Sequence, residues 1–345
     1  MATWVWLLAP SVAWFDSGEL AAAATSLGVP HPTGFPAFVL AGHDFSLLPL
    51  AAAALRVHLL GAVCAVAAVV LWRRALGVAW PGNARQALDE AAVCLAPLAM
   101  GALAMHIRAS EVYAPTWLVA AAALYALAQA PRTAPLLALL TGLGAAIHVE
   151  AALLAGMAWL WAEASLRSRW KDRMGRAALA ALALATLLYL PLAARRQPLL
   201  SWGAIDSAQA LFRHLSAASI REAYADRMGT AGGFSSLWTL VRDQAWLWLA
   251  PAALGLAVTW RRQRSRAAIT AAVLAIDALY SALVNPMGLR DQQAGLLVLL
   301  GTCVLAAEGL SWLLAQVRWT WTAPVLHAGV VWQALVQSAE FGQGD

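Results

Sequence analysis

Residues 55–72 read LRVHLLGAVCAVAAVVLW, and this stretch decides the fold class. It is almost entirely apolar and is followed at once by Arg73 and Arg74. A helix that crosses a bilayer needs about 20 apolar residues, with a range of about 17–25. The stretch therefore predicts a membrane-spanning helix.

The composition of the whole chain indicates a polytopic membrane protein. Its 345 residues are 62% hydrophobic and 12% charged, whereas a soluble domain is about 25% charged. Because apolar stretches recur along the whole length, we predict one all-α domain, residues 1–345, with about eleven transmembrane helices. The expected spans are 2–15, 55–72, 88–106, 115–130, 134–147, 150–164, 178–194, 244–260, 267–284, 294–314 and 319–337. Residues 134–164 are also compatible with one long helix.

The three cysteines and the net charge exclude several classes of protein. Cys64, Cys94 and Cys303 each lie inside an apolar stretch, which argues against a disulfide framework and against a metal cluster. The net charge of +5 does not indicate a nucleic-acid partner, because much of it lies in short connections between the expected spans.

The basic residues predict the orientation of the chain. They gather in alternate connections, and the positive-inside rule makes these connections cytoplasmic. We therefore expect an integral protein of a bacterial inner membrane, with a cytoplasmic N-terminus. The polar motifs then face outward: a first outer loop at 16–54, RASEVY at 108–113, a long outer loop at 195–243, and NPMGLRDQQ at 285–293.

The first outer loop begins with DSGELAAAATSLGVPHPTGFP at residues 16–36. Asp and Ser favour a helix start, and the residues up to Gly28 are good helix formers. Pro30, Pro32 and Pro36 prevent a helix in the following turn. We expect two short helices along the outer membrane surface, joined by this rigid turn.

Asp16 and Glu19 are three residues apart, so their carboxylates are expected to point the same way. Charges close to a membrane are costly and mark candidate functional sites. A structural interpretation is also open, in which Asp16 caps the helix and Glu19 completes a capping box.

Several motifs in order resemble one membrane family. They are DSGEL (16–20), HPTGFP (31–36), LRVHLLGA (55–62), RASEVY (108–113), GLGAAIH (142–148), LYLPLAARRQPLLSWG (188–203) and NPMGLRDQQAG (285–295). The family has bacterial and eukaryotic members and includes the vertebrate endoplasmic-reticulum protein O-mannosyltransferase that acts on plexin and receptor-kinase ectodomains. The chain departs from the family pattern at Thr33, where Pro is usual, and at His58, where Asn is usual.

The resemblance implies a GT-C-type glycosyltransferase that moves a hexose, most often mannose, from a polyprenyl-phosphate carrier to a hydroxyl. The acceptor would be a protein Ser or Thr or a glycolipid, on the outer face of the membrane. The resemblance places Asp16 as the catalytic base, with Glu19 as a second catalytic residue. This agrees with the chemistry, since a base must take the hydroxyl proton and cations must hold the phosphate. The expected substrate-binding residues are His31, Arg56, Glu111, Tyr113, His148, Arg195, Arg196, Trp202 and Arg290.

Two further points are left open by the sequence. We expect no metal cofactor, although Asp16 and Glu19 could share a divalent cation with Glu111. A transporter or lipid flippase is the alternative function, and it would predict internal repeats, which we do not find. A non-catalytic scaffold gives no reason for DSGEL and HPTGFP to occur together.

Overall fold

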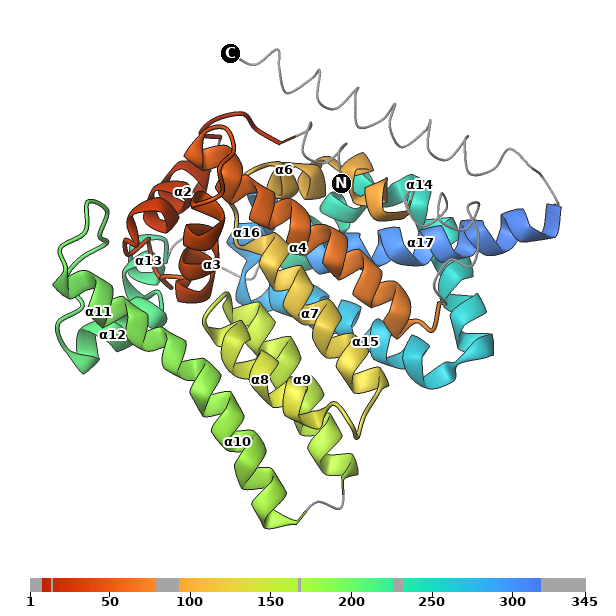
Figure 1. Cartoon of the computed structure of the whole chain (residues 1–345). Coiled ribbons are helices and arrows are strands. Elements are labelled where there is room, and N and C mark those ends of the chain that lie inside the picture. Colours follow the sequence, from red (N-terminus) through yellow and green to blue (C-terminus); the bar gives the residue numbers. More distant parts are fainter. Residues whose placement is uncertain (1–7, 14, 79–92, 167–168, 226–231, 318–345) are drawn as a thin grey trace. The chain divides into compact units, whose positions relative to one another are not determined.

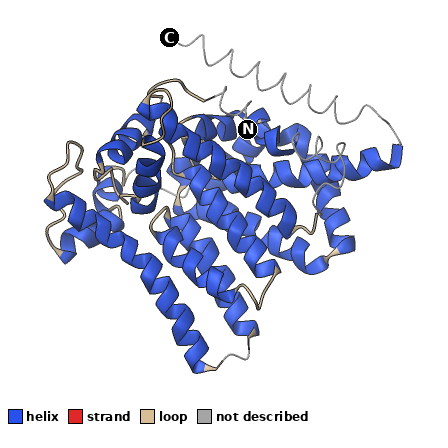
Figure 2. Cartoon of the chain, in the orientation of Figure 1, coloured by secondary structure: helices blue, strands red, loops and turns tan. Residues whose placement is uncertain are grey.

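The computed structural model of the chain describes residues 8–13, 15–78, 93–166, 169–225 and 232–317. The described residues form helices joined by short connections, and they contain no strand beyond an isolated bridge between Val29 and Ser201 (Figure 2). The predicted all-helical fold class is confirmed. The α-helices are α2 (Ser17–Ser26), α3 (Pro36–Ser46), α4 (Ala53–Ala75), α6 (Gly101–Arg108), α7 (Tyr113–Ala128), α8 (Ala134–Ala145), α9 (Val149–Ser165), α10 (Trp170–Leu184), α11 (Tyr189–Arg195), α12 (Ala208–Leu215), α13 (Ala218–Ala223), α14 (Gly233–Arg262), α15 (Arg264–Leu279), α16 (Pro286–Arg290) and α17 (Leu296–Val317). Two short 3-10 helices are η1 (Ala96–Ala99) and η2 (Ala185–Leu188), and a short π-helix is η3 (Tyr280–Val284).

The chain divides into two compact units. The N-terminal unit comprises Met1–Ala68 and His106–Gly229, and the C-terminal unit comprises Val69–Met105 and Thr230–Asp345. Every residue that the sequence nominates for the site, apart from Arg290, belongs to the N-terminal unit.

The core of the N-terminal unit lies among α7, α8 and α9 (Figure 1). Their buried faces share one apolar cluster that includes Leu137 and Ala151. Small residues allow close packing, because a Cβ on Gly142 would lie 2.2 Å from the carbonyl oxygen of Ala180 in α10. Helices α8 and α9 are separated by a turn at residues 146–148, so the alternative of one long helix over 134–164 is wrong.

The C-terminal unit is organised by the packing of α14 against α17. Gly255 allows this contact, because a Cβ there would lie 1.9 Å from the carbonyl oxygen of Leu305. The buried Asp277 accepts hydrogen bonds from the Ser281 hydroxyl at 3.0 Å and from the Val298 backbone N–H at 2.7 Å. A buried carboxylate is tolerated when such donors satisfy it, so Asp277 is a packing partner within this unit.

Within the described residues, four helices are long and apolar enough to cross a membrane. They are Ala53–Ala75, Trp170–Arg195, Arg264–Val284 and Leu296–Leu313. A fifth span arises if α6 and α7, which meet at a bend of 106°, are taken together. The predicted integral membrane protein is thereby supported, whereas the count of about eleven spans is not confirmed.

Two expected spans differ from the structure within the described residues. Residues 8–13 are not helical, because Pro10 interrupts the segment and the backbone of Ala9 instead donates a hydrogen bond to Arg108. The span expected at 88–106 is broken at η1 and at the extended Met100, next to Pro97. The span expected at 319–337 lies outside the described residues.

The expected outer loop at 195–243 contains regular structure. It includes α12 and α13, and α14 begins at Gly233, well before the predicted span start at 244. Ser207 caps α12 by accepting a hydrogen bond from the Ala210 N–H. Local capping chemistry therefore adds helices that hydropathy alone does not indicate.

Candidate active site

Helix α2 places Asp16 at the start of the site. Asp16 occupies the N-cap position, but its side chain makes no capping hydrogen bond. The Glu19 side chain binds His31, and the Asp16 backbone N–H lies beside the Glu111 carboxylate. The capping-box interpretation is therefore wrong, and the Asp16 carboxylate, whose side chain is 40% exposed, is available for another role.

The proline-rich turn carries His31 to α2. Helix α2 ends at Ser26 and α3 begins at Pro36, so the predicted rigid turn between two short helices is confirmed. Gly34 has a φ of +87°, and a Cβ there would lie 2.6 Å from Leu190. The turn needs glycine both for its backbone conformation and for space.

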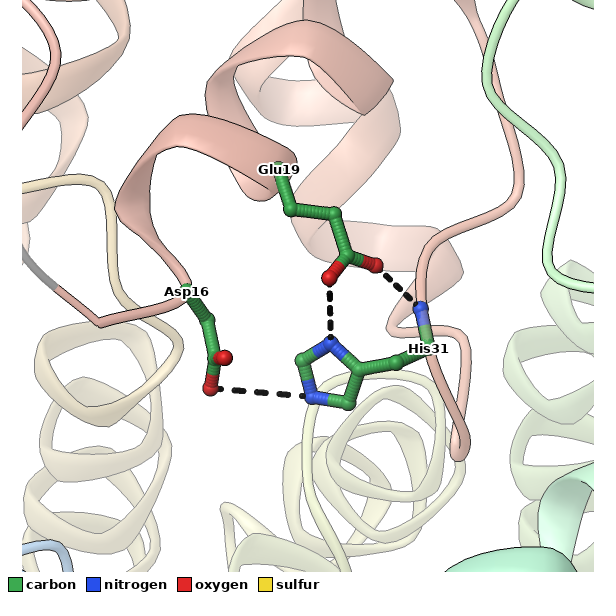
Figure 3. Close-up of side chains that lie close together, drawn as sticks. All are labelled: Asp16, Glu19 and His31. Carbon is green, nitrogen blue, oxygen red and sulfur yellow. Dashed lines mark hydrogen bonds and ion pairs between the residues drawn. The ribbon is translucent and has the colours of Figure 1, made fainter.

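The centre of the site is a row of three side chains, Glu19, His31 and Asp16 (Figure 3). Glu19 Oε1 accepts the backbone N–H of His31 at 2.5 Å, and Glu19 Oε2 lies 3.2 Å from His31 Nδ1. On the other edge of the ring, Nε2 lies 3.8 Å from Asp16 Oδ2. That separation is too long for a hydrogen bond. The ring is thus fixed by Glu19 and presents Nε2 towards Asp16.

The three groups shift one another's proton affinities. Burial raises the pKa of Asp16, and the Glu19 charge adds to this, although the charge of His31 opposes it. Burial lowers the pKa of His31, but the hydrogen bond to Glu19 and the charges of both carboxylates outweigh burial, so the His31 pKa is raised. Burial raises the pKa of Glu19, but the hydrogen bonds from His31 and Trp202 outweigh it, so the Glu19 pKa is lowered. Glu19 is therefore the permanent anion of the row.

Glu111 joins the site from the break between α6 and α7. Its residue is 1% exposed, and Oε1 has no hydrogen-bond partner among the described residues. Burial raises the pKa of Glu111 well above its usual range, the Asp16 charge adds to this, and the nearby Asp16 backbone N–H opposes it. The sequence related Glu111 to Asp16 and Glu19 only through the alternative of a shared cation, whereas the structure places the Glu111 carboxylate beside Asp16.

Aromatic rings extend from Glu111 to the start of α9. The centroid of Tyr113 lies 4.5 Å from that of His106 and 5.9 Å from that of His148. His148 is the N-cap of α9 and accepts the Glu150 N–H through Nδ1 at 3.4 Å. Desolvation lowers the pKa of His148 to about 4. Tyr113 and His148, both expected from the sequence to bind substrate, therefore lie in one group of ring contacts with His106. His148 is neutral in this group.

Trp202 reaches the row from the segment after α11. The backbone of Trp202 donates to Val29 at 2.9 Å, and Val29 donates to Leu200 at 3.0 Å. The Trp202 indole lies near Glu19 and helps to lower its pKa, and the ring lies edge-on to His31 with centroids 6.2 Å apart. The Trp202 residue is 51% exposed, so one face of the indole is open.

Two histidines in this region are not indicated by the sequence motifs. His106, in α6, stacks with Tyr113 and lies 6.4 Å from the Phe15 ring. His214, in α12, bonds the Pro30 carbonyl beneath the turn, and burial with the His31 charge lowers its pKa to about 4. No spacing rule links residues so far apart in the chain, and only tertiary contacts reveal them.

The predicted arginines do not gather at the row. Arg56 Nη1 donates to the Leu48 carbonyl at 2.8 Å, which ties the end of the first outer loop to α4. Arg195 and Arg196 are exposed at the end of α11. Arg290 belongs to the C-terminal unit, where it lines a cavity of about 420 Å³ with polar side chains of α14, among them Ser235, Ser236 and Thr239.

The row also has the spacing of a cation site. Asp16, Glu19 and His31 each offer one ligand atom, and these atoms all lie within 4.8 Å of one another. Both Glu19 oxygens are, however, already bound by His31. His31 thus already occupies both oxygens of Glu19, one of the three candidate ligands. The absence of a metal cofactor stays a prediction.

Part of the N-terminal unit is similar to a known protein family. Residues 16–172 match the family model described as "Protein O-mannosyl-transferase TMEM260 N-terminal domain". The match covers DSGEL, HPTGFP, RASEVY and the start of α9. No solved structure matches the chain.

Proposed function

We propose that this chain, whose residues 16–172 match the TMEM260 protein O-mannosyl-transferase N-terminal domain, is a membrane glycosyltransferase of that family. It takes a hexose, mannose by preference, from a polyprenyl-phosphate carrier and transfers it to the hydroxyl of a protein Ser or Thr or of a glycolipid. The enzyme is of the GT-C type and acts on the outer face of a bacterial inner membrane. Asp16 is the general base.

One observation carries the proposal: Asp16 makes no capping bond and faces a fixed imidazole edge. In the reaction, the acceptor oxygen forms a bond to the anomeric carbon, and the acceptor proton passes to the Asp16 carboxylate. The bond from that carbon to the phosphate oxygen breaks, and its electron pair leaves with the lipid phosphate. Burial raises the pKa of Asp16, which makes it a stronger base than a solvated aspartate.

Glu19 and His31 support this step as a pair. Both Glu19 oxygens are used by His31, so we assign Glu19 an orienting role within the catalytic row. His31 Nε2 and Asp16 Oδ2 are 3.8 Å apart, a distance that leaves each atom free to contact one hydroxyl oxygen. The half-exposed Trp202 offers a surface on which a sugar ring can stack.

We assign Glu111, Tyr113 and His148 to sugar binding. Glu111 interacts with Asp16 through its carboxylate, and Tyr113 connects it to His148 by ring contacts. A neutral His148, whose pKa is about 4, can hydrogen-bond a sugar hydroxyl without adding charge.

The lipid phosphate requires cations at helix ends. Arg195 and Arg196 meet this condition at the end of α11, and Arg290 meets it at the end of α16 beside a polar cavity. A guanidinium binds phosphate through charge-assisted hydrogen bonds. Arg56 is engaged by Leu48, so we assign it a supporting role in the first outer loop.

The proposal is tested by reconstituting the purified protein with polyprenyl-phosphate mannose and with Ser/Thr peptides or glycolipids, and by reading the products with mass spectrometry. Asp16→Asn should lower transfer by about 10²–10⁴-fold, the contribution of a general base, while folding is retained. Asp44→Asn, at an exposed acid of α3, is the matched control. Equal activity of both variants and the wild type would exclude Asp16 as the base.

A further inference from the structure

The segments that carry Asp16 and Glu111 meet at one buried histidine of α4. His58 is 0% exposed. Its Nε2 lies 2.9 Å from the Ser11 carbonyl oxygen, and its Nδ1 lies 2.6 Å from the Ser110 hydroxyl. Ser11 precedes Asp16 by five positions, and Ser110 is the neighbour of Glu111. One side chain therefore contacts both acid-bearing segments.

The partners of His58 fix its protonation pattern. A carbonyl oxygen can only accept, so Nε2 carries the proton that binds Ser11. In a neutral ring Nδ1 is then the acceptor, and the Ser110 hydroxyl donates to it. Both ring nitrogens are satisfied by protein groups, which is the condition under which a buried polar side chain specifies one arrangement of its surroundings.

Two further hydrogen bonds join the same two segments. The Ser110 N–H donates to Ser17 Oγ at 3.2 Å, and the Ala9 N–H donates to the Arg108 carbonyl at 3.0 Å. The Asp16 backbone N–H also lies beside the Glu111 carboxylate. Ser17 and Ser110 are 0% and 1% exposed, so water does not compete at these positions.

We propose that His58 is a positioning residue that holds Asp16 and Glu111 at a fixed separation by clamping residues 9–17 to residues 108–111. The expected loss of catalysis rests on the proposed function. The hydrogen bonds of His58 do not depend on it. Without His58, Ser110 and Ser11 lose their shared partner, and the Ser110–Ser17 and Ala9–Arg108 hydrogen bonds are left to join the two segments. A displacement of about 1 Å at a catalytic group lowers a rate by about 100-fold.

The variants separate the two contacts. Asparagine places its amide where Nδ1 lies, so His58→Asn keeps the Ser110 contact. Glutamine reaches the position of Nε2, so His58→Gln keeps the Ser11 contact, and His58→Ala keeps neither. Val57→Ala is the matched control, because Val57 is the adjacent residue of α4 and is also 0% exposed.

Hydrogen exchange and kinetics are measured on the full-length protein in detergent or nanodiscs. We expect His58→Ala to speed amide exchange in residues 9–13 and 108–112, and to lower kcat by about 100-fold with little change in the donor KM. His58→Asn and His58→Gln, which each keep one of the two contacts, should give exchange rates and kcat values between those of His58→Ala and the wild type, and Val57→Ala should change neither measurement.

Two results would overturn the proposal. Unchanged exchange in His58→Ala would show that no clamp exists. Faster exchange with a wild-type kcat, or equal losses in His58→Ala and Val57→Ala, would show that the clamp does not position the acids. If Asp16→Asn is also fully active, the proposed function fails, and the exchange measurement still decides whether the clamp exists.

Discussion

Replacing Glu19 by Gln tests the electrostatics of the catalytic row. Glu19 accepts two hydrogen bonds from His31 and pairs with its charge, and the two side chains are 21% and 16% exposed. A glutamine retains one acceptor for the His31 backbone N–H, but its amino group cannot accept from Nδ1. A hydrogen bond to a charged group is worth about 1.5–3 kcal/mol, and we expect the free energy of unfolding to fall by about that amount.

The loss should depend on pH in a defined direction. The His31 pKa is raised above 6.5 in the folded protein, so its stabilisation is complete below pH 6.5 and is lost as the pH rises through the folded value. The Glu19 pKa is lowered below 4.5, so its stabilisation is present above pH 4.5 and is lost as the pH falls through the folded value. The difference between wild type and Glu19→Gln is therefore largest between pH 4.5 and pH 6.5.

Denaturant titrations in detergent, followed by tryptophan fluorescence, measure this difference within that window and above the folded His31 pKa. NMR titration of labelled histidines should in parallel show a lower His31 pKa in the variant. Glu222→Gln is the control, because Glu222 forms an exposed pair with Arg213 that is worth about 0–1 kcal/mol. A loss that is the same at both pH values, or no larger than that of the control, would refute the charge pairing of Glu19 with His31.

Three further predictions test the orientation, the phosphate contact and the turn. Cysteines placed at Ser165 and Ser207 should be protected and reactive, respectively, towards an impermeant reagent in intact cells, and the reverse pattern would contradict the outward-facing site. Arg290→Gln should raise the KM for the lipid donor by about 10–100-fold, in line with a charge-assisted contact of about 1.5–3 kcal/mol, whereas the same change at the exposed Arg221 should have little effect; equal small changes would remove Arg290 from the donor site. Gly34→Ala should destabilise the turn by about 1 kcal/mol or more and lower the transfer rate, because the φ of +87° and the contact with Leu190 both disfavour a Cβ; an unchanged melting temperature and rate would contradict this.

The sequence determined the features that depend on local composition. The apolar run at 55–72 predicts a membrane-capable helix, and α4 occupies Ala53–Ala75. Pro30, Pro32 and Pro36 exclude a helix between α2 and α3 whatever surrounds them, because each ring removes a donor and restricts the backbone. The order of the motifs likewise indicates a resemblance to this family, and the match of residues 16–172 to its N-terminal domain model supports it.

Hydropathy failed where prolines or tertiary hydrogen bonds interrupt an apolar stretch. Residues 8–13 are apolar enough to suggest a span, but Ala9 pairs with Arg108 and Ser11 pairs with His58, so the segment is not helical. The count of about eleven spans is not confirmed, and among the described residues α8 is an apolar helix shorter than a bilayer requires.

Only the tertiary structure decided which chemical groups meet. The spacing of Asp16 and Glu19 predicts that they share a face, but it equally allows a capping box, which the structure excludes. The partner of Glu19 is His31 across a turn, and the partner of Asp16 is Glu111 from a distant helix break. Helical periodicity relates residues three or four apart, whereas contacts between segments depend on the packing of whole helices, and this is why the sequence nominated the acids but could not pair them.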